Sequence, residues 1–245
     1  MSATRTLATF HRVLRQLRGD PRTIMLLLAV PPLLLWLLDI VYRERPGSFQ
    51  SVGVPLFAVA PFVSMFLVTS VTVLRERRSG TLERLLTTPL GKADLLLGSQ
   101  LAFGVVAVLQ MTILTTLALG VLGLTFSGPT WMVAVVGVLD ALLGSALGLF
   151  ASAFARTEFQ AVQFLPAFVF PQLVLGGLLA PIEELPKGLQ YVAEVLPLTY
   201  ALEAVRAVAT QATVDAELWT DVGIVAGTVL LAVGLGAATL RRRTA

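Results

Sequence analysis

Six long apolar segments constrain this chain more than any other feature of its sequence. A helix needs about 20 apolar residues to cross the ~30 Å hydrocarbon core of a bilayer. The segments lack the alternation of a membrane β-barrel, so each is predicted to be a helix. The sequence therefore predicts an all-α membrane protein with six transmembrane helices. We place these helices at about 23–41, 52–74, 95–122, 131–155, 160–180 and 222–240.

The first apolar segment is expected to be the weakest of the six. Pro31 and Pro32 interrupt it, and Asp39 lies near its end. A proline inside a helix removes a backbone hydrogen bond and crowds the preceding turn, so we expect the helix to be interrupted here.

The composition indicates that most of the chain is surrounded by lipid rather than by water. Of the 245 residues, 56% are hydrophobic and only 13% are charged. Soluble domains carry about 25% charged residues. The chain has no cysteine, which excludes disulfides and thiolate metal sites. The net charge of +3 does not indicate a nucleic-acid partner, because the basic residues flank the apolar segments, where membrane topology explains them.

The distribution of basic residues predicts the orientation. If the N-terminus is inside, most of the 18 Lys and Arg residues fall in inner segments. The positive-inside rule then places both termini in the cytoplasm. A composition rich in Ala, Val, Leu and Gly indicates a bacterial source, so we expect the membrane to be a bacterial plasma (inner) membrane. We expect one transmembrane domain over 1–245, with spans in 23–74, 95–180 and 222–240. The predicted segments outside the membrane are 1–22, 75–94 and 241–245 on the cytoplasmic side and 181–221 on the outer side.

The segment 1–22 is predicted to be an interfacial amphipathic helix. Leu7, Phe10, Leu14 and Leu17 recur at helical spacing and form one apolar face. We expect this helix to lie in the inner headgroup layer as a topology anchor. An additional contact with a partner protein is left open.

The connection 181–221 is too long for a turn and too polar for another span. Apolar residues at helical spacing follow Pro186, which suits a first helical turn, and a second helix is expected to begin near Thr199. We predict one or two short re-entrant helices that dip into the outer half of the bilayer.

Several catalytic functions need residues that the chain lacks. Its one histidine, His11, lies far from the apolar segments, which excludes the usual histidine-dependent membrane proteases. The sequence also has no phosphate-binding loop, since Gly91 and Lys92 are followed by Ala93 and no glycine precedes them at the required spacing. We therefore expect a protein that is not an enzyme and binds no cofactor. If ATP drives it, another chain must bind the nucleotide.

Asp140 lies about halfway along the fourth apolar segment. A charged aspartate at the centre of a membrane helix costs about 2.5–3.5 kcal/mol on insertion scales. Two interpretations remain open. The residue is either part of a transport path or a structural acid hydrogen-bonded to Gln110, Gln163 or a neighbouring chain. A stand-alone secondary transporter or channel would use Asp140 for ion coupling.

A polar stretch, RERRSGTLERLLTTPLGKAD, separates the second and third apolar segments at 75–94. Gly80 is expected to cap a short helix that begins at Thr81, carries Glu83 in its first turn and ends before Pro89. The apolar face of this helix would consist of Leu82, Leu85 and Leu86. It suits either a groove on a partner protein or the membrane surface.

The same stretch resembles a motif of the permease subunits of type-2 ABC exporters, E-R-x-x-G-T-L-E-x-L-x-x-T-P. The matching residues are Glu76, Arg77, Gly80, Thr81, Leu82, Glu83, Leu85, Thr88 and Pro89. The resemblance implies that this helix is the coupling helix, which seats in an ATPase subunit. A second stretch, LPLTYALEAVRA, resembles the C-terminal signature of that family. Its matching residues are Pro197, Leu198, Thr199, Tyr200 and Arg206.

The resemblance implies a permease subunit of an ATP-driven exporter that moves amphipathic or lipid-like cargo. ATP and Mg²⁺ would bind to a separate ATPase subunit, and a second permease chain, identical or similar, would complete the pore. Residues 181–217 would form an exit gate. Pro166 and Pro171 would let the fifth span bend, and Gly144 and Gly148 would allow close helix packing in the fourth.

Overall fold

A computed structural model describes residues 2–87, 90–178 and 182–239, apart from the side chains of Leu82, Glu83 and Leu86. Every regular element in these ranges is helical. The α-helices are α1 (Ala3–Arg18), α2 (Pro21–Val41), α3 (Pro46–Arg78), α4 (Thr81–Thr87), α5 (Lys92–Gly120), α6 (Thr130–Ser152), α7 (Glu158–Leu175), α8 (Lys187–Ala193), α9 (Pro197–Thr210) and α10 (Ala216–Thr239), and η1 (Ile182–Glu184) is a 3-10 helix. The predicted tail 241–245 lies outside the described residues.

Six helices are long and apolar enough to cross a membrane: α2, α3, α5, α6, α7 and α10. Their number and order match the six predicted spans, but their ends differ. The helix predicted at 52–74 extends over Pro46–Arg78, and the one predicted from residue 222 begins at Ala216. Apolar content marks only the part of a helix that suits lipid, whereas backbone hydrogen bonding continues into the polar flanks.

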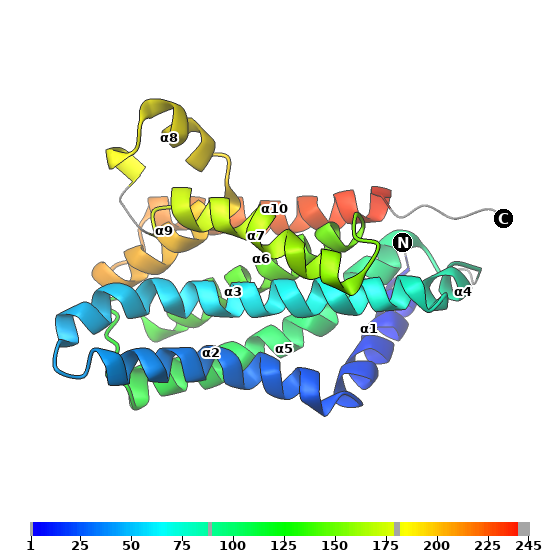
Figure 1. The fold of residues 1–245 in the computed structure, drawn as a ribbon, viewed down its shortest axis with the longest axis horizontal. Helices are drawn as coiled ribbons and strands as arrows, with labels where there is room; N and C mark the ends of the chain where they lie inside the picture. The colour runs from blue at the N-terminus through cyan, green and yellow to red at the C-terminus, as the bar shows by residue number, and fades with distance from the viewer. Residues whose placement is uncertain (1, 88–89, 179–181, 240–245) are drawn as a thin grey trace.

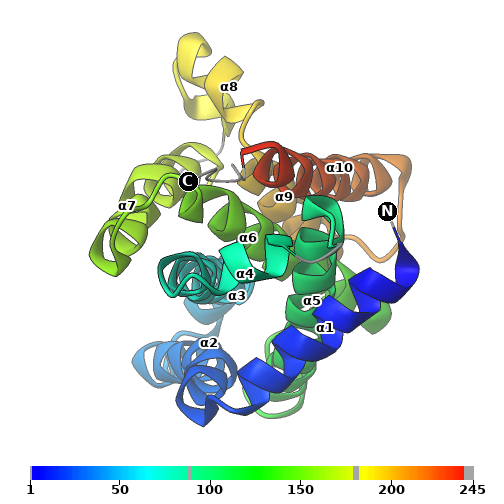
Figure 2. The same ribbon diagram turned by 90° about the vertical axis from the view of Figure 1, so that its right-hand side faces the viewer.

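The long helices lie side by side in a bundle with two different ends (Figure 1). At one end, called the α4 end here, α4 projects beyond α3 and α1 crosses the bundle. At the other, called the α9 end, α8 and α9 connect α7 to α10. Figure 2 looks at the α4 end and shows α1 lying across the outside of α5. The predicted short helices therefore gather at opposite ends of the bundle.

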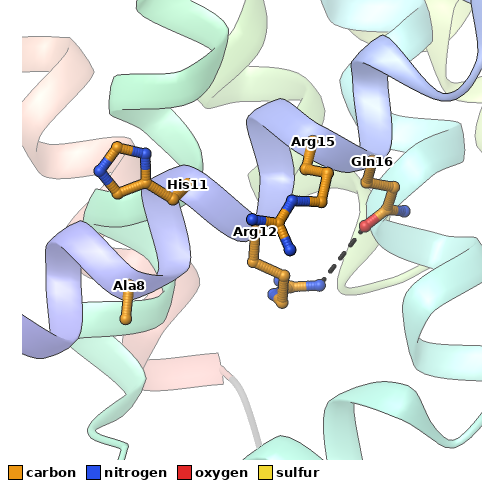
Figure 3. A pocket seen from close by; sticks show the side chains of 5 residues that line it. All are labelled: Ala8, His11, Arg12, Arg15 and Gln16. Carbon is orange, nitrogen blue, oxygen red and sulfur yellow. Dashed lines mark hydrogen bonds between the residues drawn. The ribbon is translucent and has the colours of Figure 1, made fainter.

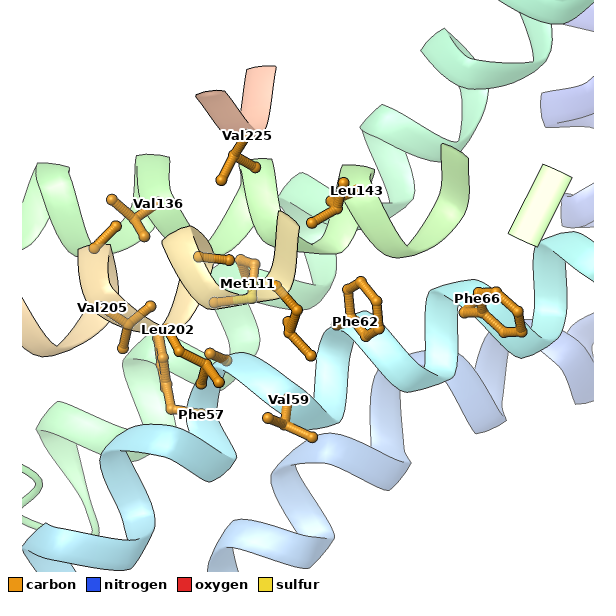
Figure 4. Close-up of a cluster of buried hydrophobic side chains, with 14 of the residues drawn as sticks. Phe57, Val59, Phe62, Phe66, Met111, Val136, Leu143, Leu202, Val205 and Val225 are labelled. Carbon is orange, nitrogen blue, oxygen red and sulfur yellow. The ribbon is translucent and has the colours of Figure 1, made fainter. Parts of the chain in front are cut away.

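The closest helix packing is between α3 and α6. A Cβ atom added at Gly144 would overlap the carbonyl oxygen of Phe62, and one added at Gly148 would overlap that of Phe66. Both pairs are four residues apart, so one ridge of each helix is in contact. The prediction that Gly144 and Gly148 allow close packing is confirmed. Around them, a cluster of buried apolar side chains joins α3, α5, α6, α9 and α10 (Figure 4).

The prediction that Pro31 and Pro32 interrupt the first span was wrong. Helix α2 continues through both prolines, and both are buried. Pro31 has no N–H to donate to the carbonyl of Leu27, four residues earlier. The amide Nε2 of Gln110, on α5, donates a hydrogen bond to that carbonyl at 2.5 Å. A neighbouring helix thus satisfies the group that the proline leaves unpaired.

The contact face of α1 is rotated from the predicted one. Thr9, Val13 and Leu17 are buried, whereas Leu7, which was expected in the apolar face, is exposed. α1 packs closely on α5 at Gly98, where an added Cβ would lie 2.6 Å from the Thr6 carbonyl oxygen. The threonines and the missing side chain allow the two backbones to approach, so apolar periodicity alone did not identify this face.

The six spans differ greatly in the share of their residues that is buried within this chain. Within the most apolar window of each helix, 67% of α3 and 61% of α6 are buried, against 17% of α7. α7 also has the lowest mean hydropathy of the six windows, 1.2, while α2, equally exposed, has 2.4. α2 therefore suits lipid, whereas α7 is the exposed span least suited to it.

Candidate functional site

The predicted coupling helix is present as α4. α3 ends at Arg78, and the turn of Ser79 and Gly80 leads into Thr81, as the sequence predicted. Gly80 has φ +70, in the left-handed region, and no atom lies within 4 Å of a Cβ added there. The glycine is needed for its backbone conformation, not for space. Thr88 and Pro89 lie outside the described residues, as do the side chains of Leu82, Glu83 and Leu86.

Leu85 is the described member of the predicted apolar face of α4. It is half-buried and packs against the main apolar cluster of its own chain. This contact differs from the predicted one, in which all three leucines face a partner. In a seven-residue helix beside the bundle, one leucine turned inward fixes the rotation of the helix about its axis.

The arginines at the end of α3 contact other helices of this chain. Arg75 forms two hydrogen bonds with Glu158 at the start of α7, both at 2.9 Å. Arg77 donates to the carbonyl of Ser152, at the end of α6, at 2.5 Å. These contacts join α3 to α6 and α7.

Glu76, expected at the ATPase contact, is buried against α1. Its carboxylate accepts hydrogen bonds from Arg12 at 2.8 Å and 3.4 Å. The first residues of the predicted coupling motif therefore tie the end of α3 to α1, and only the part from residue 80 onward projects. A partner 64 positions away in the chain gives no periodic signal, which is why the sequence did not reveal this pair.

Asp94, at the start of α5, was not singled out from the sequence. Its Oδ1 accepts from the backbone N–H of Ser2 at 3.0 Å and from the Thr6 hydroxyl at 3.4 Å, and its Oδ2 accepts from the Gly91 N–H at 3.3 Å. One carboxylate thus caps α5 and holds the beginning of α1. With Glu76, it fastens α1 across the α4 end.

Asp140 lies buried at the middle of α6. Neither of its carboxylate oxygens has a hydrogen-bond partner among the described residues. Gln110, one partner suggested by the sequence, donates instead to the Leu27 carbonyl and to Ser64. Gln163, the other, is exposed on α7. Within this chain, the structural interpretation of Asp140 as an acid bonded to either glutamine is therefore wrong.

A buried polar network lies one turn further along α6. The Ser145 hydroxyl donates to Oε1 of Gln100 at 3.2 Å and accepts from Thr69 at 3.3 Å. The Nε2 of Gln100 donates to the carbonyl of Leu142 at 3.0 Å. These contacts join α3, α5 and α6 beside the glycine contacts. Single serine and threonine residues in apolar segments are common, so the sequence could not identify the network.

The Pro-Leu-Thr-Tyr signature builds the turn between α8 and α9. Pro197 is the first residue of α9, a position where proline lacks no needed donor. The Thr199 hydroxyl donates to the Ala193 carbonyl at 2.8 Å, and the Tyr200 hydroxyl donates to the Glu194 carbonyl at 2.6 Å. Both side chains satisfy carbonyls at the end of α8, so the signature fixes how α8 meets α9.

The remaining signature residues connect α9 to α7. The backbone N–H of Leu198 donates to Oε1 of Gln172 at 3.4 Å. Arg206 donates to the carbonyl of Gly177, which lies just after α7 with φ +85. The structure thus brings all five signature residues to one junction. They hold the end of α7 against α9.

Charged groups on α9 are partly desolvated. Burial lowers the pKa of the Arg206 guanidinium, while Glu203 and Glu183 oppose this change. Burial raises the pKa of the Glu203 carboxyl above its ordinary value of 4.5, and the negative charge of Asp221 raises it further. Glu203 and Arg206 therefore lie in the same poorly solvated environment on α9.

No group of three or more His, Cys, Asp or Glu residues with the geometry of a metal site occurs in the ranges that the structure describes. The polar groups brought together at the two ends hold helices of this chain against one another. The two motifs recognised in the sequence lie about one bundle length apart, at opposite ends.

Comparison with known proteins places both motifs within one family match. The family model described as ABC-2 type transporter matches residues 4–209. The probable multidrug ABC transporter permeases YbhR and YbhS of Escherichia coli are 29% identical over 59% of this chain and 25% identical over 72% of it. The linearmycin resistance permease protein LnrN of Bacillus subtilis is 31% identical over 54% of it. The matched regions span 39%, 47% and 34% of these three relatives, less than half of each.

Proposed function

The chain belongs to the ABC-2 type transporter family, and we propose that it is the membrane subunit of an ATP-driven exporter. We propose that ATP and Mg²⁺ bind to an ATPase subunit rather than to this membrane part, whose residues include no phosphate-binding loop. The observation that carries the proposal is the position of α4, a short helix that projects at the end of the longest span. We propose that α4 seats in a groove of the ATPase.

The contacts around α4 suggest how ATPase movement reaches the membrane. α4 follows α3 after a two-residue turn, and the end of α3 contacts α1, α6 and α7 through Glu76, Arg77 and Arg75. Close packing at Gly144 and Gly148 makes α3 and α6 move as one unit. A push on α4 therefore displaces this unit against α7 and the α9 end, where we place the outer gate.

The exposed face of α7 supports a second permease chain. Gln163 is exposed, and Pro166 and Pro171 leave the carbonyls of Val162 and Ala167 without their usual helical donors. Unsatisfied backbone groups cost several kcal/mol in lipid, so this face is better placed against protein or a polar path. We propose that α7 meets a second permease chain, identical or similar, and borders the cargo path.

The cargo class comes from the relatives and the apolar lining. Two relatives are named multidrug permeases and a third a linearmycin resistance permease. Exposed phenylalanines on α7 suit an amphipathic molecule. We propose export of a drug, antibiotic, lipid or glycan across a bacterial plasma membrane. The basic α4 end and both termini lie in the cytoplasm, following the positive-inside rule.

Co-purification tests the role of α4. The tagged wild-type chain, expressed together with its neighbouring genes, is expected to retain an ATPase chain in mild detergent. The Leu82→Ala, Glu83→Ala double variant is expected to lose it. A matched double variant at the α9 end, Leu189→Ala with Glu184→Ala, alters exposed residues and should retain the ATPase. If all three proteins retained the ATPase, α4 would not be part of the ATPase contact.

Asp140 supports one alternative. A buried carboxylate without a described partner is typical of ion-coupled transporters, which place such groups at mid-membrane. In that case Asp140→Asn abolishes transport driven by a proton or sodium gradient, and the α4 variant retains it. The exporter proposal expects the opposite pattern in proteoliposomes that contain the ATPase, with transport dependent on ATP and on α4.

A further inference from the structure

The depth of α1 can be located from the exposed residues of its neighbours. α1 crosses α5 at Gly98, and three residues further on Leu101 is 52% exposed. Three helical residues rise about 4.5 Å, so the apolar outer surface of α5 begins directly beside α1. After α1, the chain enters α2, where Met25 is already 71% exposed. α1 therefore lies where the apolar surface of the bundle ends, at the level of the lipid headgroups.

The outer face of α1 is strongly basic. The helix contains no Asp or Glu, and Arg5, Arg15 and Arg18 are exposed on it. A shallow depression of about 380 Å³ lies on this face, lined by Ala8, His11, Arg12, Arg15 and Gln16 (Figure 3).

One side of this depression is held in place by the rest of the bundle. Arg12 is fixed by Glu76, and it also donates to Gln16 at 3.4 Å, along the edge of the depression. Its Nε is buried and has no hydrogen-bond partner within the described part of the chain. Because the Arg12 guanidinium is already bonded to Glu76, the exposed Arg15 is the guanidinium of this depression that suits the oxygens of a phosphate group.

We propose that this basic face of α1 binds the phosphate headgroup of an anionic phospholipid in the adjoining leaflet. Arg15 and Arg18 supply the charge that selects anionic over zwitterionic lipid, and Arg12 borders the depression. Arg12 also holds Glu76 at the end of α3, so the lipid would lie beside a residue that is bonded to the helix leading into α4. The inference concerns lipid contact and stands apart from the transport function proposed above.

Lipid is favoured over the acidic surface of another protein by the surroundings of the arginines. Leu7 is exposed on α1, and Met25 and Leu26 are exposed just after it. Basic and apolar groups exposed side by side are typical of helices that lie in a membrane interface. A protein surface that matched the arginines alone would leave these apolar side chains uncovered.

Native mass spectrometry of the full chain tests the proposal. Protein purified in detergent is equilibrated with equal amounts of phosphatidylglycerol and phosphatidylcholine, and the ratio of the two retained lipids is counted. One basic residue near a membrane surface changes anionic-lipid binding about fivefold, so Arg15→Gln should lower the ratio by about that factor. Arg18→Gln provides a second, independent variant, and Arg15→Lys, which keeps the charge, should retain the wild-type ratio.

The matched control is Arg43→Gln, which removes the same charge from an exposed position at the other end of the bundle. An unchanged ratio in both Gln variants of α1, or an equal fall in the control, would overturn the proposal. Displacement of phosphatidylglycerol by inorganic phosphate would show a site for free phosphate instead. Loss of a co-purified ATPase with lipid retention intact would show a protein interface, which also contradicts the proposal.

Discussion

The two ends of the bundle hold their helices together by different means. At the α4 end, two ion pairs join different helices, Arg12 with Glu76 and Arg75 with Glu158, beside a bond from Arg77 to the backbone carbonyl of Ser152. At the α9 end, the charged side chain of Arg206 and the hydroxyls of Thr199 and Tyr200 bond to backbone carbonyls. Both ion pairs identified among the described residues lie at the α4 end.

This difference suits the roles proposed for the two ends. An ion pair between long side chains tolerates a shift of one helix against another, because both side chains can change rotamer and still meet. A side chain bonded to a carbonyl at a helix end holds a defined position. Under the proposed function, the ion pairs at the α4 end would let its helices shift, and the bonds at the α9 end would hold that junction in place.

The largest expected effect comes from disrupting the close contact between α3 and α6, the two helices packed most tightly between the ends of the bundle. Gly144→Val places a branched side chain against the backbone of α3 at Phe62, where no rotamer change can make room. We expect a loss of about 3 kcal/mol or more in the free energy of unfolding, with little folded protein recovered. Thermal unfolding in detergent measures this loss. Gly227→Val, at an exposed glycine of α10 with open space around it, should leave stability nearly unchanged.

The second prediction concerns the fixed junction at the α9 end. Arg206→Ala leaves the buried carbonyl of Gly177 without its donor. An unsatisfied buried group costs about 1–3 kcal/mol, and we expect stability to fall by that amount. Hydrogen exchange should show the change at the end of α7 and in α9. A similar fall in Arg43→Ala, in the exposed connection between α2 and α3, would show that loss of positive charge is the cause instead.

The sequence predicted the features that repeat along a helix or that depend on one residue. Six apolar segments predicted the spans, Gly80 predicted the turn before α4, and Gly144 and Gly148 predicted a close helix contact, though not its partner. Their physical causes are local or periodic, so they can be recognised without knowing which helices are neighbours. The short helices α4 and α9 were placed within a few residues for the same reason.

The polar contacts between helices could not be predicted in this way. Proline at position 31 predicts that the Leu27 carbonyl loses its donor, but not that Gln110 replaces it from 83 positions away. Likewise, Glu76 belonged to a motif interpreted as a docking surface, and only the fold shows that Arg12 reaches it. Such pairs depend on helix packing, which the sequence alone does not specify.

The third prediction compares the two ion pairs at the α4 end. The side chains of Arg12 and Glu76 are 26% and 10% exposed, whereas those of Arg75 and Glu158 are 57% and 45% exposed. Glu76→Gln keeps an acceptor but loses the charge, which we expect to cost ~1 kcal/mol in stability. Glu158→Gln should cost about half of that or less, as for exposed pairs.

Salt distinguishes the two pairs further. At 1 M salt the screening length falls to about 3 Å, so the effect of Glu158→Gln should nearly vanish. The effect of Glu76→Gln should persist, because that pair is shielded from solvent. Thermal unfolding at low and high salt measures both. Equal salt dependence of the two variants would show that the Arg12–Glu76 contact is no better shielded than the other.

The smallest expected effect has the opposite sign and lies at the α9 end. Burial raises the pKa of Glu203, assisted by the charges of Asp221, Glu183 and Glu217 and opposed by Arg206. The folded protein therefore binds a proton more readily than the unfolded chain, and the charged carboxylate destabilises the fold at pH values above the raised pKa.

Glu203→Gln should raise the melting temperature slightly at pH 8. This gain should shrink as the pH falls through the raised pKa and vanish below about 4, where the wild-type carboxyl is protonated in both states. If the gain in melting temperature stayed constant with pH, the charge of Glu203 would not be its source. A charged carboxylate would then destabilise the α9 end no more than the α4 end.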